Sequence, residues 1–249
     1  MCNVDSLGSK FHVTIYIFHM KDFSVFEESI GVKFKNQALL QQAFVHRSYL
    51  NEHPDFGMEH NERLEFLGDA VLELVVTEFL YKTYPNPEGD LTNWRASLVN
   101  AIMLSEVAKD MNMEPYLFLS RGETKDKDSK ARQYILANAI EALVGAMYLD
   151  SGYDVVTNFI HRFLLPRLPH ILKEHLYLDA KSHFQELAQE IVGITPSYRV
   201  LEEVGPDHAR QFKVGVFLGD ELVASGEGTS KQEAQMAAAK QALVIKEWK

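Results

Sequence analysis

The spacing of apolar residues changes once along the chain, near residue 178. From Phe23 to about residue 168, apolar side chains recur every three or four positions, as in 23–30 and 38–45, which is the period of amphipathic helices. Segments rich in proline, glycine or charge interrupt this pattern and predict loops at 51–58, 84–90 and 121–130. The first region is therefore predicted to be helical.

The second region has a different pattern. It predicts a helix over 180–192, then strands near 197–203, 211–218 and 221–225, and a last helix from about Lys231. The order of these elements is α-β-β-β-α, in a small unit that follows the helical region. The fold class predicted for the whole chain is a mainly α domain followed by a small α+β domain.

Pro166 and Pro169 lie between the two regions, and proline interrupts helices and is common in linkers. We therefore expect a first domain over 20–168, a linker over 169–178 and a second domain over 179–249. Residues 1–19 are expected to lie outside the fold. For these residues two alternatives stay open: a disordered arm, or an extension preceding an alternative initiation site at Met20.

The apolar stretch at 11–20 carries His12 and His19 and is too short to span a membrane. It also lacks the features of a signal peptide, so no membrane association is expected. Cys2 is the one cysteine of the chain, which excludes a disulfide framework and a cysteine-based zinc or redox site. This usage favours the cytoplasm.

The net charge of −10 argues against a protein that binds nucleic acid simply by being basic. The chain has 249 residues, of which 46% are hydrophobic and 24% charged, as in an ordinary globular protein with room for two domains.

Acidic residues interrupt a helix that is otherwise apolar around most of its circumference. Within 61–76, Glu62, Glu65 and Asp69 lie at positions i, i+3 and i+7, which places their carboxylates along one stripe. A solvated helix face would also explain this stripe, and Glu73, which extends it, supports that interpretation.

A second apolar helix, over 135–149, carries Asn138 and Glu141 as its strongly polar residues, again on one face. An ionised carboxylate in such surroundings needs a shifted pKa, a basic partner or a bound cation. If the two stripes face each other, Glu65, Asp69, Asn138 and Glu141 form a cluster of hard oxygen donors suited to Mg²⁺, for which Mn²⁺ can substitute.

The competing explanation for this cluster is a buried salt-bridge network that uses Arg63 or Arg95. The metal site is favoured on the chemistry of the residues. Magnesium held by a few carboxylates commonly binds phosphate oxygens as well, so the natural reaction is phosphodiester hydrolysis by a metal-activated water.

The unbroken run NERLEFLGD at 61–69 resembles the signature of the ribonuclease III family. The resemblance extends over nearly the whole chain from about residue 23. It includes 39–48, similar to an early helix of the family, Glu88-Gly89-Asp90, similar to an acidic loop, and 132–150, similar to its second catalytic helix. The domain order is that of the short bacterial type.

This resemblance implies that Glu65, Asp69, Asn138 and Glu141 occupy the metal-site positions. Asp69 and Glu141 would be the catalytic residues, with Glu62 and Glu88 in supporting acidic roles. The implied activity is endonucleolytic cleavage of double-stranded RNA that leaves staggered ends with 5′-phosphate and 3′-hydroxyl groups. The implied biological role is the processing of ribosomal, messenger and other structured precursor RNA.

The resemblance also implies a homodimer, in which two nuclease domains pair and each cuts one strand. Phe66 and Leu67 of the signature would then lie partly in the interface. The chain departs from the family pattern at Asn138, where aspartate is commonest. Asparagine can still bind a metal through its carbonyl oxygen, so we expect weaker metal affinity rather than loss of the chemistry.

The second domain resembles a double-stranded-RNA-binding domain, on the motifs at 182–186, 205–208 and 226–231. Such domains recognise the shape of A-form RNA over ~16 base pairs. By similarity, Gln185, Glu186 and His208 would touch the minor groove, and Lys231, at a helix start, would contact the phosphate backbone.

Two further features reduce the affinity for RNA that is expected of this domain. Gln232 and Gln235 stand where lysines are frequent, and residues 178–249 hold 8 Lys and Arg against 11 Asp and Glu, a net charge of −3. We therefore expect modest, salt-sensitive binding. For Ser230 and Lys231, an ordinary capped helix with a solvated lysine is the alternative.

Three function classes follow from these observations. The leading one is a metal-dependent, double-strand-specific endoribonuclease. The second, raised by Asn138, is a non-catalytic double-stranded-RNA-binding or ribosome-associated protein on the same fold. The third, a metal phosphohydrolase of small molecules, leaves the second domain without a purpose. His46, Arg47 and Arg63 are left off the catalytic list. A histidine on an apolar helix is more often structural, and Arg63 could equally orient Glu62 or pair with a buried carboxylate.

Overall fold

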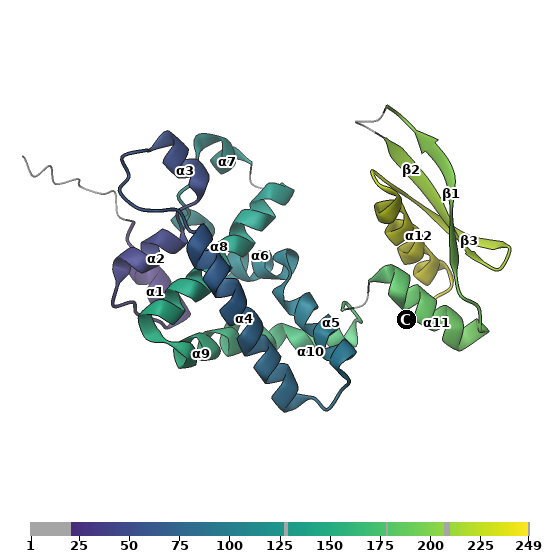
Figure 1. Cartoon of the computed structure of the whole chain (residues 1–249), viewed down its shortest axis with the longest axis horizontal. Coiled ribbons are helices and arrows are strands. Elements are labelled where there is room, and N and C mark those ends of the chain that lie inside the picture. Colours follow the sequence, from purple (N-terminus) through teal and green to yellow (C-terminus); the bar gives the residue numbers. More distant parts are fainter. Residues whose placement is uncertain (1–20, 127–128, 178, 207–209, 249) are drawn as a thin grey trace, which may run out of the picture. The chain divides into compact units, whose positions relative to one another are not determined.

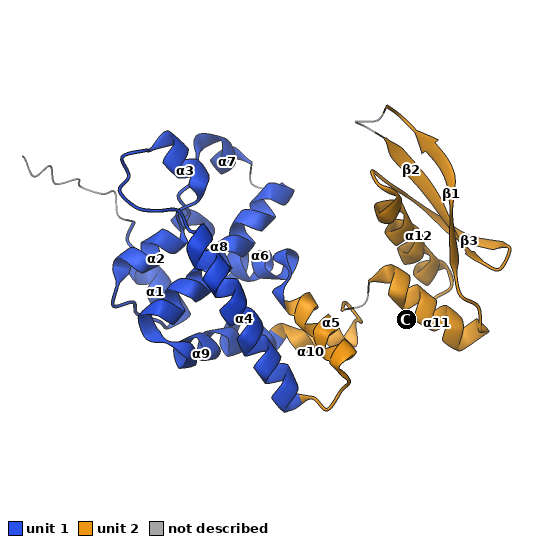
Figure 2. Cartoon of the chain, in the orientation of Figure 1, with its two compact units in different colours: residues 1–83, 99–166 blue, residues 84–98, 167–249 orange. Residues whose placement is uncertain are grey.

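The computed structural model describes residues 21–126, 129–177, 179–206 and 210–248. Its contacts divide the chain into two compact units, Met1–Thr83 with Val99–Pro166, and Tyr84–Leu98 with Arg167–Lys249 (Figure 2). This division differs from the predicted boundaries in its assignment of Tyr84–Leu98. The difference has a visible contact behind it, because the Trp94 ring packs edge-on against Tyr84 at 5.1 Å and Tyr177 at 6.1 Å.

The described part of the first unit consists of helices and the loops between them, with an isolated bridge between Val45 and Phe118. Its elements are α1 (Ser24–Ile30), α2 (Gln37–Ala43), α3 (Arg47–Glu52), α4 (Glu62–Thr83), α6 (Ala101–Asp110), η1 (Glu114–Tyr116), α7 (Arg121–Lys125), α8 (Lys130–Ser151) and α9 (Tyr153–Phe163). The two longest helices, α4 and α8, pack against each other, and α2, α6 and α9 pack around α8 (Figure 1).

The core of this unit lies where α4 and α8 meet. Leu72 and Val76 of α4 and Leu136, Leu143 and Met147 of α8 are almost fully buried. Each such side chain contributes about 1.5–3 kcal/mol of transfer free energy on burial. This explains why both helices are apolar around most of their circumference, and it makes any polar residue on their contact face notable.

Asn61 fixes the start of α4. Its side chain is buried, its Nδ2 donates to the carbonyl of Ala43 at 3.1 Å, and its backbone N–H donates to the carbonyl of Val45 at 2.9 Å. The carbonyl of Asn61 then accepts from the N–H of Glu65 at 2.9 Å. The first turn of α4 is thereby tied to the end of α2.

The second unit contains α5 (Glu88–Val99), α10 (Leu168–Lys173), α11 (Ala180–Val192), β1 (Ser197–Val204), β2 (Gln211–Leu218), β3 (Glu221–Gly228) and α12 (Lys231–Ile245), with η2 (Leu165–Arg167) at the junction. The strands form one antiparallel sheet in the order β1-β2-β3. Phe184 and Ala188 of α11, Val216 of β2 and Ala238 of α12 are fully buried in its core. The predicted fold class is confirmed.

Parts of three segments that were predicted to be loop or linker, 84–90, 121–130 and 169–178, are helical in the structure. Each difference has a physical reason. Glu88-Gly89-Asp90 is the first turn of α5, where acidic side chains interact favourably with the helix dipole. Within 121–130, Ser120 caps α7 by accepting from the N–H of Glu123 at 3.3 Å. Pro169 lies in the first turn of α10, where its missing N–H costs nothing.

No helix among the described residues is long and apolar enough to cross a membrane. The predictions made for residues 1–19 and for Met20 lie outside the described residues.

Candidate active site

Two glycines let α4 and α8 touch backbone to backbone. A Cβ atom added to Gly68 of α4 would overlap the carbonyl oxygen of Glu141, and one added to Gly145 of α8 would overlap the carbonyl oxygen of Leu64. Both glycines are buried. The two helices therefore cross as closely as their main chains permit, and any side chain beside the crossing is brought near the other helix.

The four predicted metal-site residues surround this crossing. On α4, Glu65 and Asp69 flank Gly68, and on α8, Asn138 and Glu141 precede Gly145 by seven and four positions, on the same helix face. Glu65, Asn138 and Glu141 are half-buried, whereas Asp69 is exposed. Three of the four side chains are thus partly shielded from water, and the fourth is in contact with it.

The electrostatics show that these carboxyl groups act on one another. Burial, followed by repulsion from Asp69 and Glu65, raises the pKa of Glu141 to about 8. Burial also raises the pKa of Glu65, with repulsion from Glu62 and Asp69 adding to the effect. A hydrogen bond from Asn138, whose amide donates to the Glu65 carboxylate, acts in the opposite direction.

Arg63, one of the two arginines considered as neutralising partners, is paired away from this cluster at the surface. Arg63 lies 3.9 Å from Glu59, and both side chains are largely exposed. Arg95 belongs to α5 of the other unit. The buried arginine, Arg132, donates to two main-chain carbonyls, of Glu123 at 2.6 Å and Asp126 at 3.3 Å. The contacts of Arg63 and Arg132 described above therefore do not form a buried salt-bridge network with the acidic cluster.

The donor set fits a divalent cation by charge and by chemistry. Three carboxylates and one amide supply hard oxygen atoms. A cation between them would offset the burial and the repulsion that together raise the pKa of Glu141. Within the described residues, no three histidine, cysteine, aspartate or glutamate side chains converge tightly enough to hold an ion by themselves. The fit is one of charge and donor type, not of a completed ligand shell.

The two supporting acidic residues have different positions. Glu62 is the first residue of α4, lies 3.4 Å from the Arg47 guanidinium, and is close enough to raise the pKa of Glu65. Glu88 is the first residue of α5 and belongs to the second unit, so its part in the site stays a prediction.

Sequence reasoning missed Gly145, and it left Arg47 off the catalytic list without finding its partner. A glycine inside an apolar helix costs about 1 kcal/mol relative to alanine, so Gly145 carried a usable signal of close packing. Arg47 gave no signal, because its pairing with Glu62 depends on the path of the chain between α3 and α4. His46, which sequence reasoning left off the catalytic list, has a structural contact: its Nδ1 accepts from the N–H of Ser48 at 3.3 Å and caps α3.

Large apolar side chains are exposed to solvent on the side of α4 that faces away from α8. Phe66 is 82% exposed, Leu74 is 56% exposed and Tyr81 is 79% exposed, at spacings of eight and seven residues that keep them on one face. Leu67 is half-buried. An apolar stripe of this kind on a soluble helix is typical of a protein–protein interface.

Three of the four residues predicted to touch RNA lie on two helices of the second unit. Gln185 and Glu186 are exposed on α11. Lys231, also exposed, begins α12, and its ammonium lies 5.6 Å from the centre of the Phe212 ring. Ser230 caps the helix by accepting from the N–H of Glu233 at 3.1 Å, as the alternative interpretation required. His208 lies outside the described residues.

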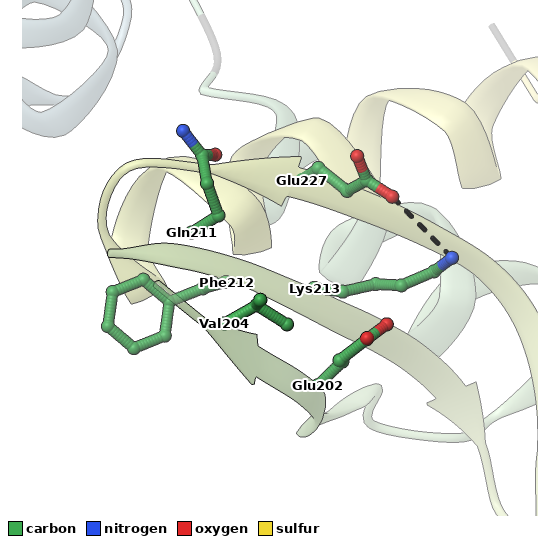
Figure 3. A pocket seen from close by; sticks show the side chains of 6 residues that line it. All are labelled: Glu202, Val204, Gln211, Phe212, Lys213 and Glu227. Atoms are coloured by element: carbon green, nitrogen blue, oxygen red, sulfur yellow. Dashed lines mark ion pairs between the residues drawn. The ribbon is translucent and has the colours of Figure 1, made fainter. Parts of the chain in front are cut away.

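Several basic residues of this unit are paired with acids at its surface. Arg210 lies 2.6 Å from Glu203, Lys246 lies 3.0 Å from Glu221, and Lys213 lies 3.5 Å from Glu227. Figure 3 shows the last pair beside a shallow hollow of about 230 Å³ that is lined by residues of all three strands. The pairing agrees with a domain that does not attract RNA by bulk charge.

Comparison with known proteins gives two family matches, which together span most of the chain. Residues 36–168 match a model described as Ribonuclease-III-like, and residues 180–244 match one described as double-stranded RNA binding motif.

Curated relatives match over nearly their whole length. The protein is 44% identical to Ribonuclease 3 of Latilactobacillus sakei over 214 residues, which are 86% of this chain and 92% of that protein. It is 44% identical to Ribonuclease 3 of Carboxydothermus hydrogenoformans over 220 residues, 88% and 93% of the two chains. The solved nuclease domain of ribonuclease III from Campylobacter jejuni is 35% identical, with a TM-score of 0.53, over 59% of this chain and 99% of that one.

Proposed function

The chain belongs to the ribonuclease III family, and from that premise we propose that it is a metal-dependent endoribonuclease that cuts double-stranded RNA with Asp69 and Glu141 as its catalytic residues. The observation that supports these residues most directly is the mutual repulsion of Glu65, Asp69 and Glu141 at the α4–α8 crossing. In the metal-free protein this arrangement costs stability, and a bound cation would reverse that cost.

In this proposal, Glu65, Asp69, Asn138 and Glu141 hold Mg²⁺, or Mn²⁺ in its place. When bound, the ion lowers the pKa of a water and so supplies a nucleophile for phosphodiester hydrolysis. Glu141, whose pKa is raised to about 8, would release its proton on binding. Asn138 keeps one amide N–H on Glu65 and has its carbonyl oxygen available for the ion.

The remaining acidic residues have supporting roles. Glu62, held by Arg47, adds negative charge beside Glu65 without entering the buried crossing. Glu88 is proposed as a further acidic group on the strength of the family resemblance. The products would carry 5′-phosphate and 3′-hydroxyl groups at staggered ends.

We infer that the enzyme works as a homodimer through the nuclease domain. The exposed apolar stripe of Phe66, Leu74 and Tyr81 on α4 supports a second copy as the partner. The Campylobacter jejuni nuclease domain is described as having a region involved in dimer formation. Two active sites in one particle would explain how both strands of a duplex are cut.

The domain at 179–249 binds double-stranded RNA by this proposal, with Gln185, Glu186 and His208 at the minor groove and Lys231 at the backbone. The domain at 20–168 is the nuclease, and 169–178 joins them. Ribosomal and other structured precursor RNAs in the cytoplasm are the proposed substrates. The near-complete coverage of catalytic relatives disfavours a non-catalytic binder.

The test is cleavage of a perfect RNA duplex by the purified chain in Mg²⁺. We expect short products with staggered ends, abolished in Glu141→Gln. Glu73→Gln, one turn beyond Asp69 on the same stripe of α4 and half-buried, is the matched control and should retain activity. An intact duplex across a range of salt concentrations, in both Mg²⁺ and Mn²⁺, would refute the proposal.

A further inference from the structure

The first five residues of α12 contain one lysine, Lys231. Positions 231 and 235 lie four residues apart and share one helix face, but the second is Gln235. Gln232, beside them, is also uncharged at neutral pH. Within this face of α12, Lys231 is thus the cation supplied by the helix itself.

Lys181 of α11 reaches this face from the neighbouring helix. Its Nζ donates to Oε1 of Gln235 at 2.8 Å, and both side chains are half-buried. The ammonium of Lys181 therefore lies at the end of the Gln235 side chain, beside the helix face that carries Lys231. The contact replaces a missing charge with one from another element.

Two further contacts hold Lys181 in this position. Its ammonium lies 5.1 Å from the centre of the Tyr198 ring of β1, a cation–π geometry. Its backbone N–H donates to Asp179, which caps α11, at 3.0 Å. The side chain is therefore directed across α11, β1 and α12, and less of its rotamer freedom is left to lose on binding.

The ammonium of Lys181 can still bind an anion. An ammonium carries three N–H donors, and Gln235 accepts one of them. The acidic residue that interacts with the charge of Lys181 is Asp179, whose carboxylate caps α11 by accepting from the N–H groups of Lys181 and Ser182 and from the hydroxyl of Ser182. The positive end of the α12 dipole adds to the attraction for phosphate at this end of the helix.

We propose that Lys181 is a further phosphate-binding residue of the RNA-binding domain, which delivers from α11 the positive charge that α12 lacks at position 235. The inference deepens the proposed function and rests on its double-stranded-RNA binding, not on its cleavage. It also explains how a domain with a net charge of −3 by sequence presents two ammonium groups on one helix face.

The test is the salt dependence of duplex binding by the full chain in a chelator, so that no cleavage occurs. The probe is an RNA duplex longer than the ~16 base pairs that such a domain spans. Lys181→Met should weaken binding roughly threefold to tenfold and reduce the slope of log K against log salt by about 1, as expected for the loss of one phosphate contact. Lys181→Arg should keep the slope of the unaltered chain.

The matched control is Lys240→Met. Lys240 is an exposed lysine of α12, nine residues after Lys231 and so on the opposite side of the helix. It should change neither affinity nor slope. The double variant Lys181→Gln with Gln235→Lys moves the charge between the two partners of one hydrogen bond, and it should restore the slope even if Lys181→Met alone disturbs folding.

A slope in Lys181→Met equal to that of the unaltered chain, or a double variant that fails to restore it, would overturn this inference while leaving duplex binding in place. Absence of duplex binding by the unaltered chain would instead overturn the binding part of the proposed function, and the inference with it.

Discussion

The α4–α8 crossing and the surface of the RNA-binding domain differ in how their charges are arranged: like charges are clustered at the crossing, and opposite charges are paired on the domain surface. At the crossing, Glu65, Asp69 and Glu141 are kept close together, and burial and repulsion raise the pKa of Glu141 to about 8. On the RNA-binding domain, acids such as Glu203 and Glu227 lie beside Arg210 and Lys213 in solvent. At the crossing, a bound cation would relieve unfavourable interactions between the carboxylates. On the RNA-binding domain, the acids named here already lie beside basic residues, so a cation would relieve little.

The difference shows where each kind of function can be built. Concentrating like charges needs a rigid scaffold, and the contact of Gly68 with Gly145 supplies it. Recognising a duplex by shape needs several weak contacts spread over two helices and tolerates acidic neighbours. Four predictions test this contrast.

The largest effect is expected at the scaffold itself. In Gly145→Ala the new methyl group would overlap the carbonyl oxygen of Leu64, so α4 and α8 must separate. We expect a loss of about 2–4 kcal/mol in the free energy of unfolding, measured by urea denaturation. Cleavage should also fall, because the carboxylates move apart.

Gly89→Ala is the matched control for this prediction. Gly89 lies in α5, and a Cβ added there meets nothing within 4 Å. The variant should be neutral or more stable by up to about 1 kcal/mol. Equal stability of Gly145→Ala and the unaltered chain would show that the glycine contact does not hold the crossing.

The second prediction concerns Glu141 and pH. Its pKa is about 8 in the folded metal-free chain and near its ordinary value of 4.5 when unfolded, so between these values the folded state binds more protons. Stability should therefore be highest below pH 4.5 as far as this group is concerned, and should fall as pH rises to about 8. Glu141→Gln removes this fall.

At pH 8.5 in chelator, Glu141→Gln should thus be more stable than the unaltered chain, by roughly 1–2 kcal/mol, since the group is only half-buried and solvent screens part of the repulsion. In Mg²⁺ the same variant should lose cleavage by roughly a factor of 10³ or more. Thermal unfolding at pH 5.5 and 8.5, with both chains, checks the sign; a variant that is less stable at both values contradicts it.

How far the sequence predicted these two regions depends on the kind of contact. The order of the α-β-β-β-α unit was predictable: α11 and β2 have the predicted bounds, α12 begins at the predicted Lys231 with a serine cap, and β1 and β3 extend one and three residues beyond their predictions. The polar positions of the two long apolar helices likewise indicated Glu65, Asp69 and Glu141. Both signals are local in the sequence.

Contacts between distant segments were not predictable in this way. The short helices α7 and α10 were expected as loop and linker, because charge and proline were weighed above the Ser120 cap and the buried Leu168 and Ile171. The pairing of Arg47 with Glu62, and of Lys181 with Gln235, joins residues on different elements. No pattern along the chain encodes which elements meet.

The third prediction alters the charge of the crossing without removing a carboxylate. Asn138→Asp deletes the amide that donates to Glu65 and adds a fourth negative charge. We expect the metal-free chain to lose about 1 kcal/mol of stability at pH 8.5, and the Mg²⁺ concentration for half-maximal cleavage to fall several-fold. A higher Mg²⁺ requirement in this variant would contradict a metal site at Asn138.

The smallest effect is expected for Glu227→Gln in the RNA-binding domain, which is the same chemical change as Glu141→Gln. Glu227 is 72% exposed and lies 3.5 Å from Lys213, and exposed ion pairs contribute about 0–1 kcal/mol. Its removal should change the free energy of unfolding by less than about 0.5 kcal/mol, with the same value at pH 5.5 and 8.5, and should leave the cleavage rate unaltered. Because charge, side-chain size and method are matched between the two variants, a pH-dependent gain in Glu227→Gln as large as that in Glu141→Gln would mean that the effect does not arise from the crossing.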